Sequence, residues 1–344
     1  MKYDKIKYLT LLCLLLLSES CSAIKMEKGM KQIKAPFDGA RFENIEPFED
    51  KGFFSLLKWR LTRDSPDWKE VSNQKFHKPK FQRSKELTLT LIGHSTVLIQ
   101  INNINILTDP HYSKRSSIVT WAGPKRIIRP AIKFSDLPPI DLVLISHNHY
   151  DHLDIPTLKL LNAKFSPKVL VGLGNKELLK SNGITNVVEM DWWDKFLFNG
   201  IPISFTPTQH WSARGLFDKR KTLWGGFLIE ATKKIFFAGD TGYGKVFKQI
   251  NQKYGAIDVG LIPIGAYEPR WFMKDAHVNP EEAVKIFLDL KLKHGFGIHF
   301  GTFKDLTDEP VDKPINDLNQ ALLKFKVSNK NFIAPIFGKA YDYK

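Results

Sequence analysis

The pattern of hydrophobic and polar positions changes near residue 85. From there, short apolar runs bounded by turns predict strands at 87–92, 97–101, 104–107, 142–145, 169–171, 203–205, 227–229, 235–237 and 259–262. Apolar residues at helical spacing predict helices at 155–162, 175–181, 243–254, 280–290 and 314–325. Pro280, followed by Glu281 and Glu282, is typical of a helix start. Residues 85–344 are therefore expected to form one α/β domain.

Residues 24–84 form an N-terminal extension that is polar, basic and aromatic, without strand-like alternation. Its one periodic stretch, residues 53–61, predicts a basic amphipathic helix formed by Phe53, Phe54, Leu57 and Leu61, with Lys58, Arg60 and Arg63 nearby. Two roles are open for this helix. It can pack on the adjacent domain, which is the commoner case, or lie on a membrane surface.

The first 23 residues have the features of an export signal. Three lysines precede the apolar stretch Leu9–Leu17, and small residues follow it. This stretch is shorter than the roughly 20 residues that a membrane span needs. Cleavage before Cys21 would expose a cysteine for lipid attachment, whereas cleavage after Ala23 would release a soluble protein. We expect an exported, periplasmic protein and favour the lipoprotein anchored through Cys21.

Composition narrows the partners and the metal ligands. With 51 Lys and Arg against 36 Asp and Glu, the net charge is +15, which suits an anionic membrane surface or a phosphate-bearing substrate. No nucleic-acid-binding motif is recognisable, so nucleic acid is not expected as a partner. Both cysteines, Cys13 and Cys21, lie in the export segment. A transition metal in the folded body must therefore be held by histidines and carboxylates.

The candidate chemistry centres on a short loop after the buried strand at 142–145. His147, His149 and Asp151 occupy alternate positions, and His152 follows directly. A loop attached to a strand end can direct several side chains to one point, so the first two histidines can bind one ion and the next two residues a second. Imidazole and carboxylate without thiolate suit zinc or another first-row divalent ion.

More potential ligands stand where later strands end. His210, Asp240 and His299 each follow a predicted strand or strand end, and ligand sites in layered α/β proteins collect at such ends. His94 is either a turn residue or a residue that supports a ligand. Three further histidines, His77, His111 and His294, are interpreted as surface or packing residues.

The whole set resembles the metallo-β-lactamase superfamily. Within it, the chain is similar to the N-acyl-phosphatidylethanolamine-hydrolysing phospholipase D family over about residues 40–340. The segments that carry this resemblance are 107–110, 122–126, 137–141, 209–212, 237–243, 262–273 and 299–303. The segment 262–273 is the most specific of these, because the superfamily as a whole shares the metal signature.

The resemblance implies a four-layer αβ/βα sandwich with two zinc ions, or other divalent metals, between the sheets. By the same resemblance, one ion is held by His147, His149 and His210. The other is held by Asp151, His152 and His299. Asp240 bridges the two ions, and Asp109 orients a ligand histidine rather than binding metal.

The implied activity is a zinc-dependent phosphodiesterase of phospholipase D type. It would hydrolyse N-acyl-phosphatidylethanolamine or related phospholipids to N-acylethanolamine and phosphatidic acid, with a water activated by the metals. The catalytic residues are assigned as Asp151 and His277, and His277 would donate to the phosphate or assist the leaving alcohol. The substrate-binding residues are assigned as Tyr267, Arg270 and Trp271, with Trp211 and Phe272 as further walls of an apolar entry. Arg270 is equally compatible with a structural role.

Three other functions remain open from the sequence. The same metal site could cleave another ester, a lactone or an amide. A lipid-anchored envelope protein could use the metals for structure alone, although a shared carboxylate leaves room for water that closed structural sites lack. A nuclease would suit a basic chain, but an exported protein seldom meets nucleic acid.

Overall fold

The computed structural model describes residues 34–64, 66–71, 74–215 and 217–344. Residues 34–344 form one compact unit. The predicted export signal, Cys21 with its two processing routes, and residues 24–33 of the extension lie outside the described residues and stay predictions. In the part of the chain that is described, no helix has both the length and the apolar character needed to cross a bilayer.

Two seven-stranded mixed sheets form the body of this unit. The first has the order β16-β1-β2-β3-β5-β6-β7, and its strands are β1 (Leu87–Gly93), β2 (Thr96–Ile101), β3 (Ile104–Thr108), β5 (Leu142–Ile145), β6 (Lys168–Gly172), β7 (Val187–Met190) and β16 (Ala340–Tyr343). The second has the order β15-β13-β12-β11-β10-β9-β8, and its strands are β8 (Lys195–Phe198), β9 (Ile201–Thr206), β10 (Gly226–Glu230), β11 (Lys234–Phe237), β12 (Val259–Pro263), β13 (His294–Ile298) and β15 (Phe332–Ile333).

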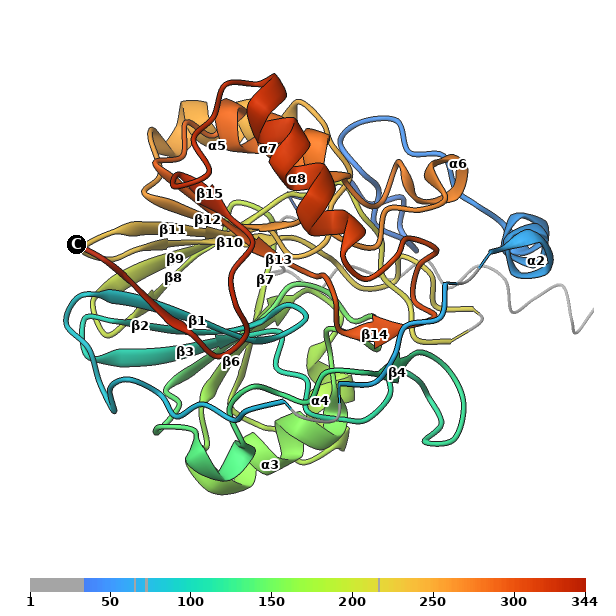
Figure 1. Cartoon of the computed structure of the whole chain (residues 1–344). Coiled ribbons are helices and arrows are strands. Elements are labelled where there is room, and N and C mark those ends of the chain that lie inside the picture. The colour runs from blue at the N-terminus through green and yellow to red at the C-terminus, as the bar shows by residue number, and fades with distance from the viewer. Residues whose placement is uncertain (1–33, 65, 72–73, 216) are drawn as a thin grey trace, which may run out of the picture. The chain divides into compact units, whose positions relative to one another are not determined.

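Helices cover the outer faces of the two sheets. Figure 1 shows α5 (Val246–Tyr254), α7 (Pro280–Asp289) and α8 (Lys313–Lys324) on one side, and α3 (Ile155–Phe165) and α4 (Lys176–Ser181) on the other. The four layers confirm the predicted αβ/βα sandwich. Smaller elements lie at one end of the sandwich. Strands β4 (Lys125–Arg126) and β14 (Phe303–Lys304) form a two-stranded ribbon there, and the helices α6 (Arg270–Met273) and α2 (Phe53–Thr62) lie at the same end.

The inner strands β1, β2, β3 and β5 of the first sheet are buried on both faces, which explains their nearly continuous apolar sequences. In β5, Leu142 and Leu144 join the core between the sheets, whereas Val143 and Ile145 pack with Leu158 of α3. Successive side chains of a strand point to opposite faces, so one run of four apolar residues serves two cores. The strand therefore ends in a rigid base for the loop that follows it.

Local sequence signals explain several element boundaries. All nine predicted strands are present, and the helix predicted at Pro280 is confirmed. There, Asn279 accepts a hydrogen bond from the Glu282 backbone amide and the Glu282 side chain accepts one from the Asn279 amide, which completes a capping box. The helix predicted to begin at residue 243 begins at Val246 instead.

The described part of the N-terminal extension packs on the body. The backbone amide of Phe42 donates to the carbonyl of Arg220, and the buried Phe42 ring belongs to the core between the sheets. Further along, Asn44 hydrogen-bonds both the amide and the carbonyl of His210. This segment therefore runs along the loop that carries a predicted metal ligand.

Candidate metal centre and adjoining pocket

The seven predicted ligands come together at one end of the sandwich, on loops that follow β5, β9, β11 and β13. Three of them converge as predicted. His147 Nε2 lies 2.9 Å from His149 Nδ1, and His210 Nε2 lies 3.2 Å from the same His149 atom. Three imidazole nitrogens that face one another in this way can share a single cation.

Asp240 lies between this group and the second one. Its Oδ2 is 3.1 Å from His152 Nε2 and 3.2 Å from His299 Nε2. The same oxygen is 4.0 Å from His147 Nε2 and 3.9 Å from His210 Nε2. The position between two histidine groups is the one that a bridging carboxylate requires.

The close approach of the Asp240 loop to the histidine loop depends on a glycine. Gly239 has a φ of +62°, and a Cβ built on it would lie 2.4 Å from the Cβ of Ser146. Both the conformation and the lack of space exclude a larger side chain without rearrangement. Gly239 thus allows Asp240 to reach the cluster.

Asp151 belongs to the second group and has a partner that the sequence left open. Asp151 Oδ2 is 3.4 Å from both His152 Nε2 and His299 Nε2, and His94 Nε2 lies 3.1 Å from it. His94 is also a turn residue between β1 and β2, with a φ of +52°, so both of its proposed roles apply. The Gly93-His94 turn was the available signal, but it does not indicate which carboxylate the ring meets.

Contacts outside the cluster hold the Nδ1 atom of three of these histidines, His147, His152 and His210. Asp109 Oδ2 accepts from His152 Nδ1 at 2.6 Å and from the Ser146 hydroxyl at 2.6 Å. Because that hydroxyl donates to Asp109, it accepts from His147 Nδ1 at 2.9 Å. His210 Nδ1 donates to the carbonyl of Ala276 at 2.9 Å. Each Nδ1 is thus held by a partner outside the cluster and each Nε2 is left to face the cluster, the usual arrangement of metal-binding histidines.

Burial keeps the first histidine group neutral. Desolvation lowers the pKa of His147, His149 and His210, with that of His149 reaching about 4, and the neighbouring histidines add to the effect at His147. A neutral imidazole is the form that binds a metal. This group therefore has its lone pairs available at neutral pH.

The second group carries a different charge balance. Burial opposes the charged form of His152 and His299, but Asp240 and Asp151 outweigh it and raise the pKa of both, that of His299 to about 9. The same histidines outweigh the desolvation of Asp151 and Asp240 and hold the pKa of those carboxyls well below its usual range. Both carboxylates are thus ionised, as metal ligands must be.

Unsatisfied polar atoms show that these residues fit a divalent cation. Among the described residues, His152 Nε2, His299 Nε2 and both Asp240 carboxylate oxygens are buried without a hydrogen-bond partner. Leaving such an atom unsatisfied costs about 1–3 kcal/mol. His152 Nε2 and His299 Nε2 both lie within 3.2 Å of Asp240 Oδ2, so one bound cation would satisfy these three atoms together.

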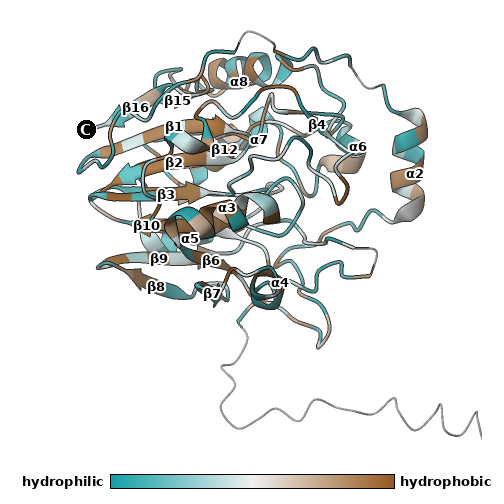
Figure 2. Cartoon of the chain, turned by 90° about the horizontal axis from the view of Figure 1, so that it is seen from below, coloured by the Kyte–Doolittle hydropathy of each residue, from teal (hydrophilic) through white to brown (hydrophobic). Residues whose placement is uncertain are grey.

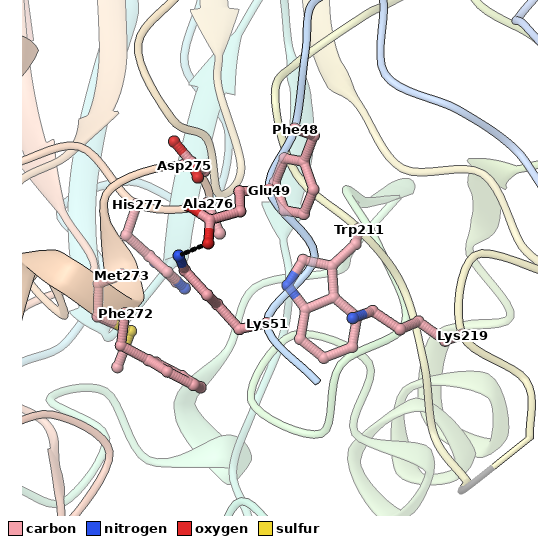
Figure 3. Close-up of a pocket in the computed structure, with 10 residues that line it drawn as sticks. All are labelled: Phe48, Glu49, Lys51, Trp211, Lys219, Phe272, Met273, Asp275, Ala276 and His277. Atoms are coloured by element: carbon pink, nitrogen blue, oxygen red, sulfur yellow. Dashed lines mark ion pairs between the residues drawn. The ribbon is translucent and has the colours of Figure 1, made fainter. Parts of the chain in front are cut away.

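A pocket adjoins the cluster on the side of His277. His277 Nδ1 lies 3.7 Å from Asp240 Oδ2, and burial lowers its pKa to about 4. Figure 3 shows the residues that line the pocket with it, which are Phe48, Glu49, Lys51, Trp211, Lys219, Phe272, Met273, Asp275 and Ala276. The Trp211 ring also contacts His149, with centroids 4.3 Å apart. The pocket therefore joins the metal cluster to apolar walls and two lysines.

The N-terminal extension contributes three of these lining residues, which sequence reasoning did not identify. Phe48, Glu49 and Lys51 belong to a segment without any periodic pattern. Gln209 Nε2 donates to the carbonyl of Pro47 at 3.0 Å, which holds this segment beside the His210 loop. A pattern within residues 44–51 could not have revealed a contact with a loop far along the chain.

The three predicted substrate contacts lie elsewhere. Tyr267 is buried, and its hydroxyl donates to Asp317 at 2.6 Å. Arg270 donates to the carbonyl of His277 at 2.8 Å and pairs with Glu282 at 2.8 Å. The structural role left open for Arg270 is the one its contacts support. Trp271 is 43% exposed and lies beside α2, outside the pocket lining.

His111, which was interpreted as a packing or surface residue, is buried. Its Nδ1 accepts from the Arg126 guanidinium at 3.0 Å. Arg126 in turn packs over the Phe303 ring at 4.6 Å from its centroid. His111 is therefore part of the packing beneath the loops, as expected.

We predict that Asp109→Asn weakens metal binding about 10- to 100-fold, because the amide cannot accept from His152 and Ser146 as the carboxylate does. Competition with a chromophoric chelator measures the affinity. Asp141→Asn is the matched control, since Asp141 precedes β5 at its opposite end and pairs with Arg83. Unchanged affinity in Asp109→Asn would mean that Asp109 does not orient His152.

Comparisons with known proteins agree with this geometry. The model of the beta-lactamase superfamily domain matches residues 104–300. N-acyl-phosphatidylethanolamine-hydrolyzing phospholipase D 1 of Caenorhabditis elegans is 38% identical over 275 residues, which are 76% of this chain and 77% of that protein. The mitochondrial N-acyl-phosphatidylethanolamine-hydrolyzing phospholipase D of Saccharomyces cerevisiae is 40% identical over 222 residues, 62% of this chain and 47% of that one.

A solved structure supports the fold independently. A metallo hydrolase from the hyperthermophilic archaeon Ignicoccus hospitalis superimposes with a TM-score of 0.56 at 20% identity, over 75% of this chain and 98% of that one. At this identity the likeness concerns the fold alone, because one fold serves many reactions. The loops and their side chains must supply the argument for function.

Proposed function

Because this chain belongs to the N-acyl-phosphatidylethanolamine-hydrolysing phospholipase D family of the beta-lactamase superfamily and is a metal-dependent hydrolase, we propose that it cleaves a phospholipid phosphodiester. The substrate is N-acyl-phosphatidylethanolamine or a related lipid, and the products are N-acylethanolamine and phosphatidic acid. The cofactor in this proposal is a pair of zinc ions held by the two ligand groups.

The observation that carries the proposal is the pocket between the cluster and the extension. Its lysines, Lys51 and Lys219, suit a phosphate, and its aromatic rings suit acyl chains. Lys219 lies over the Trp211 ring at 4.7 Å from its centroid and pairs with Asp50 at 2.7 Å. Lys51 likewise pairs with Glu49 at 2.5 Å, so a phosphate would take the place of these carboxylates at the two lysines while the apolar tails contact the rings.

When bound, the metals would lower the pKa of a water molecule and offset charge on the phosphoryl oxygens. The chain's own residues then have separate tasks. Asp109 and Ser146 hold the ligand histidines in place, and Trp211 shields one side of the cluster from solvent. His277, neutral at pH 7 because its pKa is about 4, donates a hydrogen bond to a phosphoryl oxygen. Donation of a proton to the leaving alcohol would need the charged ring and is not part of the proposal.

The test is the identity of the cleaved bond. The protein is loaded with zinc and incubated in ¹⁸O-labelled water with vesicles that contain N-acyl-phosphatidylethanolamine, and lipid products are identified by mass spectrometry. We expect N-acylethanolamine without label and phosphatidic acid with one ¹⁸O, because water attacks phosphorus. His152→Ala should lose metal and nearly all of this activity.

Other outcomes would redirect the assignment. Label in a fatty acid would mean that an ester or amide bond is cleaved, as in the alternative that the sequence left open. Full activity in a metal-depleted sample would overturn the mechanism. Parallel assays with a lactone and a β-lactam test the remaining members of that alternative.

A further inference from the structure

The helix α2 presents an apolar face to solvent. Phe54 is 82% exposed, Leu57 41% and Leu61 77%. Leu57 and Leu61 follow Phe54 by three and seven residues, so the three side chains share one face of the helix. Of the two roles that the sequence left open, packing this face on the adjacent domain is therefore wrong.

The opposite side of α2 explains why the apolar face stays outside. Trp59 is buried there, stacks on Phe272 with centroids 4.9 Å apart and donates from its indole nitrogen to Asp308 at 2.6 Å. One turn later, Arg63 pairs with the same Asp308 at 2.9 Å. Rotating the helix to bury its leucines would break these contacts, so the exposed face is fixed by the structure.

Basic side chains border the apolar face. On the helical wheel Lys58 and Arg60 lie on either side of it, and the sequence of α2 contains no acidic residue. Lys58 Nζ also lies 5.0 Å from the centroid of the Trp271 ring, which is itself 43% exposed. Apolar residues bordered by cations and joined by a tryptophan are typical of helices that lie in a lipid interface.

The face lies next to the pocket. Phe272 stacks on Trp59 of α2 and also lines the pocket of Figure 3. The pocket residues Phe48, Glu49 and Lys51 immediately precede α2 in the chain. Figures 1 and 2 both show α2 outside the two sheets, at the end of the sandwich where α6 lies.

We propose that the outer face of α2, formed by Phe54, Leu57 and Leu61 and bordered by Lys58 and Arg60, docks the protein on a phospholipid bilayer beside the pocket mouth. The apolar side chains enter the headgroup region, and the two cations contact lipid phosphates. The choice of lipid as the partner rests on the proposed function. The charge pattern also favours it, since a basic rim complements an anionic surface.

The experiment measures vesicle binding and hydrolysis separately. The full chain carries Cys21→Ser throughout, so that an acyl anchor cannot mask the helix. Flotation with vesicles of phosphatidylethanolamine and phosphatidylglycerol compares the parent with Leu57→Gln/Leu61→Gln. We expect the partition coefficient of the double variant to fall on the order of 10- to 100-fold. Glutamine favours helix about as well as leucine, so α2 should persist, and circular dichroism checks this.

A matched pair controls for the general effect of removing an exposed leucine. Leu61 is 77% exposed on α2, and Leu323 is 81% exposed on α8. Leu61→Gln should lower the partition, and Leu323→Gln should leave it unchanged. On a dispersed short-chain phosphodiester the double variant should retain the parent kcat/KM, while its hydrolysis of vesicle lipid falls with binding.

Each outcome separates this inference from the proposed function. If the parent hydrolyses vesicle lipid and the double variant binds as well as the parent, the docking surface is wrong. If no phospholipid is cleaved but flotation depends on Leu57 and Leu61, the docking surface stands and the proposed function fails. A change from dimer to monomer in light scattering, with vesicle binding unaltered, would show that the face binds a second copy instead and would overturn the proposal.

Discussion

Replacing Asp240 by asparagine is expected to abolish binding of metal at both groups and to lower kcat/KM about 10³-fold or more. Asp240 Oδ2 faces His152 and His299 at 3.1 and 3.2 Å and also approaches the first group. An amide has nearly the same shape, but it lacks the charge that a bridging ligand shares between two cations. Metal ions supply several kcal/mol of stabilisation to such reactions, which corresponds to a loss of this size.

Two measurements check this expectation. Metal content is determined by inductively coupled plasma mass spectrometry after dialysis against zinc, and activity is measured on the same preparation. Asp191→Asn serves as the control, because Asp191 is also a buried carboxylate, but it accepts backbone hydrogen bonds from Ala35 and Trp192 away from the cluster. If Asp240→Asn retained two metals and substantial activity, Asp240 would not be the bridging residue.

The metal cluster could be predicted from the sequence because its ligands are closely spaced or directly follow predicted strands. His147, His149, Asp151 and His152 follow a recognisable buried strand, and His210, Asp240 and His299 also stand at strand ends. Strand ends of a sandwich meet at one edge, so the position along the chain already implies the position in space. Asp109, whose role the family resemblance implied, directly follows β3 and contacts His152.

The pocket could not be predicted in the same way, because its residues are joined only by tertiary contacts. Lys51 and Trp211 lie far apart in the sequence, and the segment before α2 has no periodic pattern. For a related reason, Tyr267, Arg270 and Trp271, the substrate contacts assigned within 262–273, do not line this pocket. A specific sequence motif indicates that a loop matters, but Tyr267 and Arg270 turn out to hold that loop through Asp317 and Glu282.

Some strands escaped prediction because neither face is strongly apolar. In β8, Phe196 and Phe198 are only partly buried and alternate with the exposed Lys195 and Leu197. At an edge of the other sheet, β16 pairs only with β1 and contains an aspartate. Edge strands depend on hydrogen bonds to a neighbour rather than on a buried apolar run, so their sequences give weak signals.

The helix α2 was predicted correctly as an element, but the sequence left open whether its apolar face points inward or outward. Its residues were predicted to be helical, and the apolar stripe was recognised. Periodicity alone suggested that this stripe faces the protein, which is the usual case. A single tryptophan reverses the orientation, because Trp59 stacks on Phe272 and hydrogen-bonds Asp308. The burial of one large ring outweighs the number of smaller apolar residues on the other side.

Substitution of His277 is expected to give the second large loss of activity. The substitutions also distinguish a hydrogen-bond donor from a residue that transfers a proton. We expect His277→Phe to lower kcat about 10²-fold, the typical cost of removing one donor to a developing phosphoryl charge. His277→Gln should recover part of this loss, because its amide can still donate. Burial lowers the pKa of His277 to about 4, so only about one ring in a thousand is protonated at pH 7.

The sign of this shift determines the pH profile. With its pKa lowered to about 4, His277 is neutral throughout the range from pH 6 to 8, so as a hydrogen-bond donor it adds no limb of its own to the pH profile of kcat there. A general acid of pKa about 4 would make kcat fall tenfold for each unit above that value. A falling limb that disappears in both His277 variants would therefore contradict the assignment. Loss of metal from His277→Phe would instead place His277 among the ligands, since it lies 3.7 Å from Asp240 Oδ2.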